Sequence, residues 1–360
     1  MNTSGACPYC GVDPASTAAE YPMALKPGSI LNGRYILGHV LGQSHFGITY
    51  FAWDDWEETL VAIKEYLPTE FVGRSTGSPS VLVHSGEQTE DFAYGKAQFT
   101  EEAKTLAAFI GSPDIVRIYS YFEENGTAYL CMEYVDGLPL DKYMETRGGR
   151  LSPKEANRLL LPLMESLEAA HAKGIVHRNI APDSILVTPQ GTAKLINLGV
   201  GRYSTGEKTV LVDNTINYGF VPLEQYSRRG RQGPWTDVYA LGATYYYAIT
   251  GKVPPDATSR RLEEFTLYPP EMLGVKIDAA SQTALLKALA VNESERFQSM
   301  GDFHAAMLAA SGEAGRQMPG LPPEETNTAR EELVAVRETQ ADPKWDFPLF
   351  RKNRESRSRH

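Results

Sequence analysis

The apolar residues of this chain change their spacing near Gly137, and this change limits the folds that the chain can adopt. From residue 34 to residue 66, apolar and polar residues alternate in three short runs that glycines interrupt. Two more such runs flank Asn125-Gly126, a dipeptide that is typical of a tight β-hairpin. Alternation places every second side chain on one face of a strand, so residues 31–135 predict a small antiparallel sheet of five strands.

One main helix is expected to accompany this sheet. The segment "FAYGKAQFTEEAKTLAAFI", residues 92–110, reads as a helix and lies between the third and fourth strands. A Gly/Ser-rich loop is expected before it, near Arg74 to Gly86. The order of elements is therefore strand, strand, strand, helix, strand, strand.

Residues 136–311 have a helical pattern instead. Ser152, Pro153 and Glu155 have the spacing of an N-cap, a first helical residue and a capping box. The apolar residues that follow form one stripe along a helix. Further helices are expected near Asp237, Ala279 and Met300. The fold class is thus α+β, with a small sheet lobe at residues 31–135 and a larger, mainly helical lobe at residues 136–311.

Residues 1–30 are expected to form a leader with a cysteine pair. Cys7 and Cys10 stand in the sequence "CPYCG", a CxxC pattern. A structural zinc site needs four ligands, and the chain has no second CxxC and no nearby pair of histidines, so we do not expect zinc there. The pair can be an unliganded remnant, half of a zinc site shared across a dimer, or a redox pair. Three cysteines cannot build a disulfide framework, which fits a reducing cytoplasm.

Residues 312–360 differ from the rest of the chain in composition. Glu, Pro, Thr and Gly are frequent there and large apolar residues are few. Burial in such a segment cannot offset the entropy lost on ordering, so a disordered tail is predicted. The tail ends in "KWDFPLFRKNRESRSRH", an aromatic cluster followed by a basic run. That end is either a solvated terminus or a docking peptide for a partner.

The charge and hydropathy of the chain argue against two classes of partner. The chain has 45 acidic and 35 basic residues, a net charge of -10, which gives no attraction to nucleic acid or to an anionic membrane. The longest apolar stretch, "VYALGATYYYAIT", is shorter than the ~20 residues of a membrane span, and residues 1–19 lack the features of a signal peptide. We therefore expect a cytoplasmic protein whose partners are proteins or small molecules.

Two motifs in the sheet region point to a phosphate site. "LGQSHFGITY" joins the first two strands, and its glycines would let backbone amides approach phosphate oxygens, although glycines also form plain hairpins. In the next strand, "VAIK" ends in Lys64. A lone lysine on a strand is usually solvated, but Glu102 on the following helix is a candidate ion partner.

Together with motifs farther along the chain, these residues resemble the signature set of protein kinases. The matching segments are Gly42-Gln43-Ser44-His45-Phe46-Gly47, Val61-Ala62-Ile63-Lys64, Glu102, "MEYVDG", "HRNIAPDS", "NLG" and "DVYALGA", in that order. The segments "GITYFAWD", "VAIKEYLPTEF" and "GFVPLEQY" are most similar to the bacterial eukaryotic-like Ser/Thr kinases. The resemblance covers about residues 34–311 and implies a bilobal protein-kinase-like fold.

The resemblance also implies roles for individual residues. Lys64 would hold the α and β phosphates of ATP and pair with Glu102, and Asp237 would brace the catalytic loop from beneath. The other implied structural positions are Arg178, Gly199 and the buried ion pair of Glu224 and Arg296. The other implied nucleotide-binding residues are Leu41, Gly42, Gly47, Thr49, Ala62, Met132 as gatekeeper, Glu133 to Val135 as hinge, and Leu186.

Four positions depart from the kinase pattern, and all four serve the transfer of phosphate. Asn179 stands at the position of the general base, and an amide cannot take a proton at neutral pH. Ala181 replaces the lysine that would touch the transferred phosphate. Ser184 and Asn197 replace an asparagine and an aspartate that would bind Mg²⁺, an ion that prefers carboxylates. Asp183 is a neighbour of the ligand position and not the ligand itself.

These departures predict a pseudokinase that acts as a signalling, scaffolding or allosteric module. ATP binding would be weak and Mg²⁺ binding weak or absent, because the lysine and its partner remain while the metal ligands are lost. Protein partners are expected, among them an active kinase or a signalling complex. Two alternatives stay open: a weakly active ATP-dependent Ser/Thr protein kinase, and an enzyme that transfers another part of ATP on the same fold.

By the same resemblance, residues 199–224 form the activation loop. Thr205, Thr209 and Thr215 lie in it and could accept a phosphate group. Arg178, next to Asn179, could pair with such a phosphate. Loop threonines are common, however, and most of them have no such role.

Overall fold

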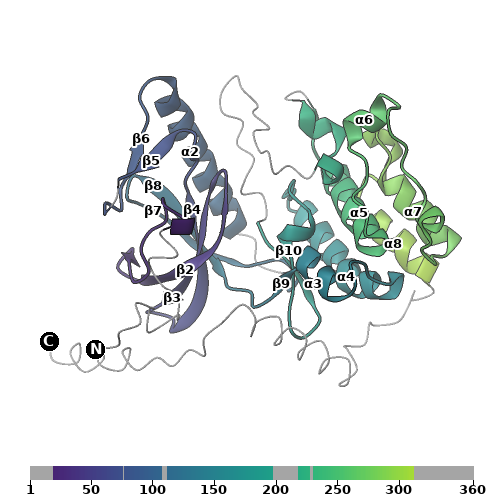
Figure 1. Cartoon of the computed structure of the whole chain (residues 1–360), viewed down its shortest axis with the longest axis horizontal. Helices are drawn as coiled ribbons and strands as arrows, with labels where there is room; N and C mark the ends of the chain where they lie inside the picture. Colours follow the sequence, from purple (N-terminus) through teal and green to yellow (C-terminus); the bar gives the residue numbers. More distant parts are fainter. Residues whose placement is uncertain (1–18, 76, 108–111, 198–217, 228–229, 312–360) are drawn as a thin grey trace.

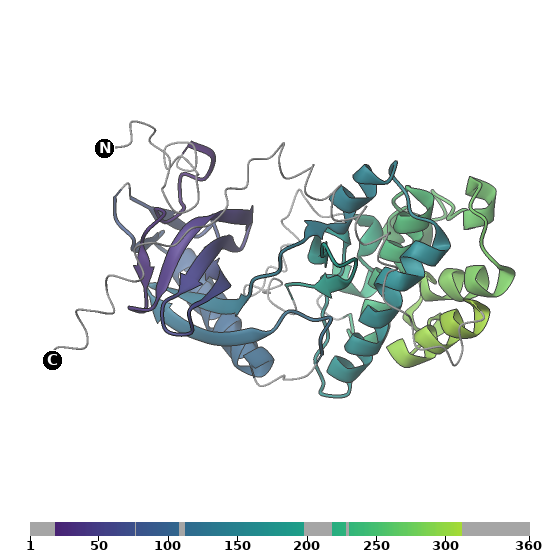
Figure 2. The same cartoon turned by 90° about the horizontal axis from the view of Figure 1, so that it is seen from below.

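A sheet lobe and a helical lobe lie side by side in the computed structural model of the chain (Figure 1). A view turned by 90° shows the same two lobes along the long axis (Figure 2). The α+β class and the division into a small sheet lobe and a larger helical lobe are as predicted. Among the residues described, no helix has both the length and the apolar character needed to cross a bilayer. The structure describes residues 19–75, 77–107, 112–197, 218–227 and 230–311.

The main sheet has six antiparallel strands, one more than predicted, in the order β1-β2-β3-β4-β8-β7. The five longer strands are those expected from the alternating pattern, and Asn125 and Gly126 form the turn between β7 and β8. The additional strand, β1, has only two residues, too few to show alternation in the sequence. The strands are β1 Ile30–Leu31, β2 Tyr35–Ser44, β3 Gly47–Asp54, β4 Thr59–Tyr66, β7 Ile118–Glu124 and β8 Thr127–Glu133.

A two-stranded hairpin, β5 (Val72–Arg74) with β6 (Val81–Val83), stands where the sequence predicted a loop. Val72 and Val81 are buried, and Val81 N–H donates to the carbonyl of Asn125 at 2.8 Å. The prediction was wrong because the glycine and serine residues that indicated a loop lie between the two short strands, at Ser75 to Ser80, and after them, at Ser85 and Gly86.

The main helix of the sheet lobe is α2 (Glu87–Ala107), which begins five residues before the predicted segment and contacts β7. Tyr66 of β4 packs against Phe92 and Phe99 of this helix. Gly95 faces the same tyrosine, and a Cβ atom there would lie 2.1 Å from the Tyr66 hydroxyl oxygen. The absence of a side chain at residue 95 therefore sets how closely α2 approaches the sheet.

A buried ion pair on β4 connects the sheet to segments before and after it. Glu65 is fully buried, and Arg74 of β5 donates hydrogen bonds to both oxygens of its carboxylate. The hydroxyls of Tyr50 and Tyr129 donate to the same carboxylate at 2.8 Å each. Burial raises the pKa of both phenols, which keeps them protonated as donors. Arg74 also donates to the carbonyl of Met23, so the segment before β1 is held against the sheet lobe.

The second lobe consists mainly of helices, as predicted. Ser152 caps α4: its hydroxyl accepts from Glu155 N–H at 3.2 Å, and the Glu155 carboxylate accepts from Ser152 N–H at 2.9 Å. The predicted capping box is thus confirmed. The elements are β9 Leu138–Pro139, α3 Leu140–Thr146, α4 Pro153–His171, β10 Ile185–Val187, β11 Ala193–Leu195, α5 Pro234–Thr250, α6 Ala257–Arg261, α7 Ala279–Ala288 and α8 Met300–Ser311, with 3₁₀ turns at Pro182–Ser184, Tyr218–Phe220, Leu223–Tyr226, Pro270–Leu273 and Glu293–Glu295.

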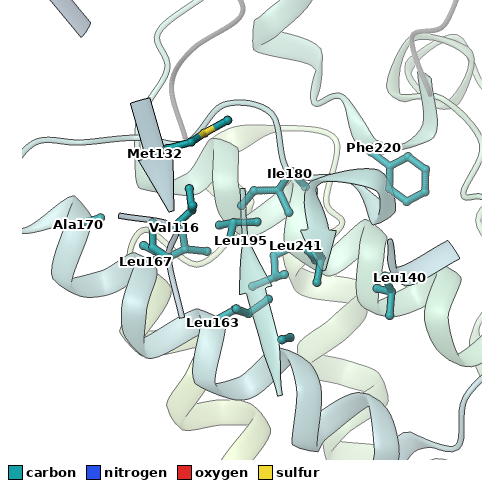
Figure 3. Close-up of a cluster of buried hydrophobic side chains, with 14 of the residues drawn as sticks. Val116, Met132, Leu140, Leu163, Leu167, Ala170, Ile180, Leu195, Phe220 and Leu241 are labelled. Carbon is teal, nitrogen blue, oxygen red and sulfur yellow. The ribbon is translucent and has the colours of Figure 1, made fainter. Parts of the chain in front are cut away.

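Apolar side chains from both lobes meet beside α4 (Figure 3). Leu163 and Leu167 of α4 belong to one buried cluster with Leu195 of β11 and with Val116, which precedes β7. Val116 N–H donates to the carbonyl of Leu195 at 2.9 Å, and Leu195 N–H donates to the carbonyl of Asp114 at 2.8 Å. These contacts attach the sheet lobe to the helical lobe and fix the position of the site between them.

Candidate nucleotide-binding site

Lys64 is the buried cation of the site and lies on β4. Its Nζ donates a hydrogen bond to Oδ1 of Asn197 at 3.2 Å. Burial lowers the pKa of Lys64 to about 8, and the nearby carboxylate of Glu102 opposes this shift. The structure therefore brings Lys64 together with Glu102, its predicted acidic partner, and with Asn197, one of the four positions that differ from the kinase pattern.

Glu102 extends from α2 toward a second cation, Arg178. One carboxylate oxygen of Glu102 lies 4.0 Å from Nη1 of Arg178, whose side chain is 44% exposed. Glu102 thus acts electrostatically on both Lys64 and Arg178. The backbone of Arg178 is left-handed, with φ of 64°, a conformation that a residue other than glycine adopts only where its surroundings hold it.

The surroundings that hold this backbone centre on Asp237, in the first turn of α5. Its buried carboxylate accepts hydrogen bonds from Arg178 N–H at 2.8 Å and from His177 N–H at 2.7 Å. Nε2 of His171, at the end of α4, lies 2.8 Å from the same carboxylate. Gln225 donates from Nε2 to the carbonyl of Arg178 at 3.0 Å. Asp237 has the bracing position that the resemblance implies, whereas sequence reasoning missed His171 and Gln225, which no motif marks individually.

The ring of His177 connects the catalytic loop to the segment before Asn197. Asn179 N–H donates to Nδ1 at 3.2 Å, so the proton of the neutral ring is on Nε2 and is donated to the carbonyl of Ile196 at 3.0 Å. Burial lowers the pKa of His177 to about 4, which keeps the ring neutral near pH 7. These two hydrogen bonds hold the backbone of the loop at Asn179, the predicted base position, against the segment that leads to Asn197.

Ser184 is engaged within its own loop. Its buried hydroxyl donates to the carbonyl of Ala181 at 2.8 Å and accepts from Ala181 N–H at 3.0 Å. The side chain thus closes the 3₁₀ turn Pro182–Ser184. Its proton and one of its lone pairs are used there, which leaves little capacity for a metal ion.

Asn197 is the last of the four residues that differ from the kinase pattern. Its backbone is left-handed, with φ of 63°, which asparagine tolerates better than most residues. Its amide oxygen accepts from Lys64 and brings no negative charge. Over the ranges that the structure describes, no group of three or more His, Cys, Asp or Glu residues is arranged to hold a metal ion.

The residues implied for the adenine side come from five strands around Lys64. In the sheet register, Thr49 pairs with Gly42 on β2 and with Lys64 on β4, and Ala62 pairs with Met132 on β8. Leu41 is 41% exposed at the outer end of β2. The remaining implied residues are Glu133 at the end of β8, Val135 directly after it, and Leu186 on β10.

At two of these positions, Gly47 and Glu133, the structure shows a role for the residue that the sequence did not indicate. A Cβ atom at Gly47 would lie 2.0 Å from the carbonyl oxygen of Glu65, so only glycine fits there. The side chain of Glu133 forms an ion pair with Lys194 of β11 and accepts from Arg117 N–H at 3.2 Å. Because this side chain is engaged within the protein, the groups of Glu133 that could bind a nucleotide are those of its backbone.

The helical lobe contains the ion pair that the resemblance implies. Arg296 donates from Nη1 and Nη2 to the two carboxylate oxygens of Glu224, at 2.8 and 3.1 Å, and both side chains are buried. The hydroxyl of Thr236 adds a third hydrogen bond to Glu224 at 2.9 Å. Other sequence predictions, namely Gly199, Thr205, Thr209, Thr215, Cys7 and Cys10, lie outside the described residues.

Comparisons with known proteins agree with this arrangement. The sequence profile of the protein kinase domain matches residues 35–272. The Ser/Thr protein kinase PknA of Mycobacterium tuberculosis is 30% identical over 307 residues, which cover 82% of this chain and 65% of that protein. PrkC of Bacillus subtilis, also a Ser/Thr protein kinase, is 28% identical over 290 residues, 79% of this chain and 41% of that protein.

A solved structure described as the apo form of PpkA-294 is also similar. Its TM-score is 0.69 and its sequence is 29% identical, with 79% of this chain and 99% of that chain covered. The chain spans less than two thirds of the length of PknA and of PrkC, two of its curated relatives. The profile match, the relatives and the shared architecture show that this chain belongs to the protein kinase domain family.

Proposed function

We propose that this chain is a pseudokinase, a kinase-fold protein that binds ATP weakly without a metal ion and transfers phosphate slowly or not at all. Its role would then be to present a nucleotide-sensitive surface to a protein partner, as an allosteric or scaffolding module. The relatives PknA and PrkC are named as Ser/Thr protein kinases, which suggests a partner in signalling.

The hydrogen bond between Lys64 and Asn197 is the observation that carries this proposal. In a working kinase, an aspartate at residue 197 would hold Mg²⁺ on the phosphates. Here a neutral amide takes that position, and its oxygen already accepts from the lysine. Ser184, at the second metal position, is engaged with Ala181. Asn197 and Ser184, which occupy the two metal positions, are thus both engaged in internal hydrogen bonds. This supports a site without magnesium.

The same arrangement supports retention of a nucleotide. With a pKa of about 8, Lys64 is mostly protonated at pH 7, and no carboxylate at residue 197 neutralises it. A phosphate oxygen is a stronger acceptor for this ammonium group than an amide oxygen. ATP could therefore displace Asn197 as the partner of Lys64.

Thermal unfolding with ATP tests the metal-free binding. We expect ATP to raise the Tm equally in EDTA and in MgCl₂, because the binding contacts involve no metal ion. The variant Lys64→Met should lose the rise, and the surface variant Lys142→Met, at a lysine whose side chain is 55% exposed, should keep it. A rise in Tm that requires magnesium would contradict the proposal.

Product analysis distinguishes the two alternative activities. A weakly active kinase is favoured by the presence of Lys64, Glu102 and Asp237, and it would incorporate γ-phosphate into itself or into a general substrate. An enzyme that transfers another part of ATP would instead release a different product, which mass spectrometry identifies. If either product forms, and Lys64→Met abolishes its formation, the chain is an enzyme and the pseudokinase proposal is wrong.

A restored triple variant tests whether the scaffold is otherwise competent. Asn179→Asp, Ser184→Asn and Asn197→Asp together would return the base and both metal ligands. We expect this variant to show a magnesium-dependent rise in Tm with ATP and phosphate transfer that the natural chain lacks. If the parent already transfers phosphate as fast as the triple variant, the chemistry was not lost.

A further inference from the structure

Lys64 brings one buried positive charge to the candidate nucleotide site. Its ammonium group has three N–H donors, which can reach oxygens on two neighbouring phosphate groups of a nucleotide but not on a third. The charged group that acts on Lys64 is the carboxylate of Glu102, which offsets part of the lysine's charge. A nucleotide with three phosphates therefore needs another cation or further donors for its terminal phosphate.

The loop of residues 179–184 is held beside Lys64 through the segment that follows β11. Ile196 N–H donates to the carbonyl of Ser184 at 2.8 Å. The next residue, Asn197, accepts from Lys64 at 3.2 Å. The charge of this loop therefore acts on a phosphate chain that Lys64 holds.

This loop supplies no positive charge to the phosphates. Its six residues, "NIAPDS", contain one ionisable side chain, the carboxylate of Asp183. Ala181 carries only a methyl group, which cannot neutralise a phosphate oxygen. The cation that precedes the loop, Arg178, has its Nη1 atom 4.0 Å from Glu102, so part of its charge is offset as well.

The loop between β2 and β3 already uses one of its backbone donors. The Ser44 hydroxyl accepts from Phe46 N–H at 3.3 Å and donates to the carbonyl of Gly47 at 3.4 Å. Leu67 N–H donates to the carbonyl of Phe46 at 2.8 Å, which fixes the tip of the loop to the segment after β4. A phosphate oxygen must displace Ser44 before it can accept from the Phe46 amide.

We infer that this site binds nucleoside diphosphates more tightly than nucleoside triphosphates or monophosphates. Two phosphates use the full reach of Lys64, and one phosphate uses only part of it. A third phosphate adds a negative charge for which residues 179–184 offer no cation, and a charge that loses water without gaining a partner weakens binding. The inference rests on the proposed metal-free binding, because a magnesium ion would neutralise the terminal phosphate.

Isothermal titration of the full chain with ADP, ATP and AMP, each in EDTA at pH 7, tests this order of affinity. We expect the Kd of ADP to be about tenfold lower than that of ATP and also about tenfold lower than that of AMP. If ATP or AMP binds as tightly as ADP, the inference is wrong while the proposed metal-free binding stands. If none of the three binds in EDTA, the proposed function is wrong and the inference fails with it.

The variant Ala181→Lys tests whether the missing cation causes the preference. The hydrogen bonds of Ala181 with Ser184 are made by its backbone, so a lysine there can keep them. Its ammonium group is placed to pair with the terminal phosphate. The Kd of ATP should therefore fall about tenfold, while the Kd of ADP stays nearly constant.

A matched control separates this local effect from a change in net charge. The variant Ala280→Lys adds the same side chain at an exposed position of α7 and should leave the Kd values of ADP and ATP unchanged. The inference is overturned if Ala181→Lys strengthens the binding of ADP and ATP equally, if it strengthens neither, or if Ala280→Lys has the same effect.

Discussion

Lys64 is buried beside the amide of Asn197, and we expect this to make the proposed nucleotide binding sensitive to pH. Its pKa of about 8 lies below the ordinary value because burial penalises the charged form. The charged form is the one that holds phosphate. We therefore expect ATP affinity to be nearly constant from pH 6 to pH 7.5 and to fall above pH 8, by up to ~tenfold per pH unit. A fluorescent ATP analogue titrated at pH 7, 8 and 9 measures this.

The variant Lys64→Arg provides the control for this prediction. A guanidinium group stays protonated throughout this range, so the variant should bind more weakly at pH 7 but with a flat pH profile. If the natural chain and the arginine variant lose affinity in parallel above pH 8, another group is responsible for the pH dependence.

His177 is expected to make folding sensitive to acid. Its pKa is about 4 in the folded chain, below its ordinary value of about 6.5, so the unfolded chain binds more protons between these values. Stability contributed by the neutral ring is thus lost as the pH falls from about 6.5 toward about 4. Between pH 7 and pH 5 the loss amounts to about 2 kcal/mol.

Urea unfolding at pH 7 and pH 5 measures this loss. The variant His177→Gln should be less stable at pH 7 because it loses ring hydrogen bonds, yet it should lose about 2 kcal/mol less than the natural chain on acidification. The matched variant His84→Gln, at an exposed position of the sheet lobe, should retain the full loss. Identical losses in all three proteins would show that His177 is not the titrating group.

Sequence motifs named the residues of the candidate site, but they did not name the residues with which these side chains interact. Lys64, Glu102 and Asp237 were found because motifs mark them. The bond from Lys64 to Asn197 could not be foreseen, because it joins residues 133 positions apart through the packing of two lobes. Gln225 was missed for the same reason, since its hydrogen bond to the Arg178 carbonyl depends on how the segment before α5 folds back.

At the scale of elements, the position of α2 depends on one close contact. Because a Cβ atom at residue 95 would lie 2.1 Å from the Tyr66 hydroxyl, Gly95→Ala must push the helix from the sheet or turn the ring. We expect a loss of stability of about 1–3 kcal/mol, although alanine is otherwise the better helix former. Glu102 is on the same helix, so weaker ATP binding should accompany the loss. Urea unfolding and ATP titration measure the two effects.

A double variant separates this contact from other effects of alanine. In Tyr66→Phe the hydroxyl is absent, so adding Gly95→Ala should cost much less than it costs in the natural chain. An equal cost in both backgrounds would mean that the hydroxyl contact does not position α2.

Elements were predicted well where a hydrophobic period runs over a whole strand or helix. The capping box of α4 and the five longer strands of the main sheet are examples. The β5–β6 hairpin was missed because two three-residue strands are too short for a period, and their pairing depends on burial of Val72 and Val81. The start of α2 was placed too late because its first turn, from Glu87, lacks apolar residues.

At the scale of the molecule, the contacts between the lobes are expected to make them unfold together. The hydrogen bonds of Leu195 with Val116 and Asp114 and the ion pair of Glu133 with Lys194 cross from one lobe to the other. Burial of the shared apolar cluster adds to them, since each lobe alone would expose its side of it. Urea should therefore unfold both lobes in one transition, as cooperative single domains do.

Tryptophan fluorescence can report on each lobe separately. Trp53 and Trp56 lie in the sheet lobe and Trp235 lies at the start of α5. With Trp345→Phe in both proteins, Trp235→Phe leaves only the sheet lobe visible, and Trp53→Phe/Trp56→Phe leaves only the helical lobe visible. The two urea midpoints should coincide with that of circular dichroism in each protein. Adding Val116→Ala should lower the urea midpoints of both lobes together. If the midpoint of one lobe moves and that of the other does not, the lobes are independent folding units. The candidate nucleotide site would then lie between two bodies that move separately.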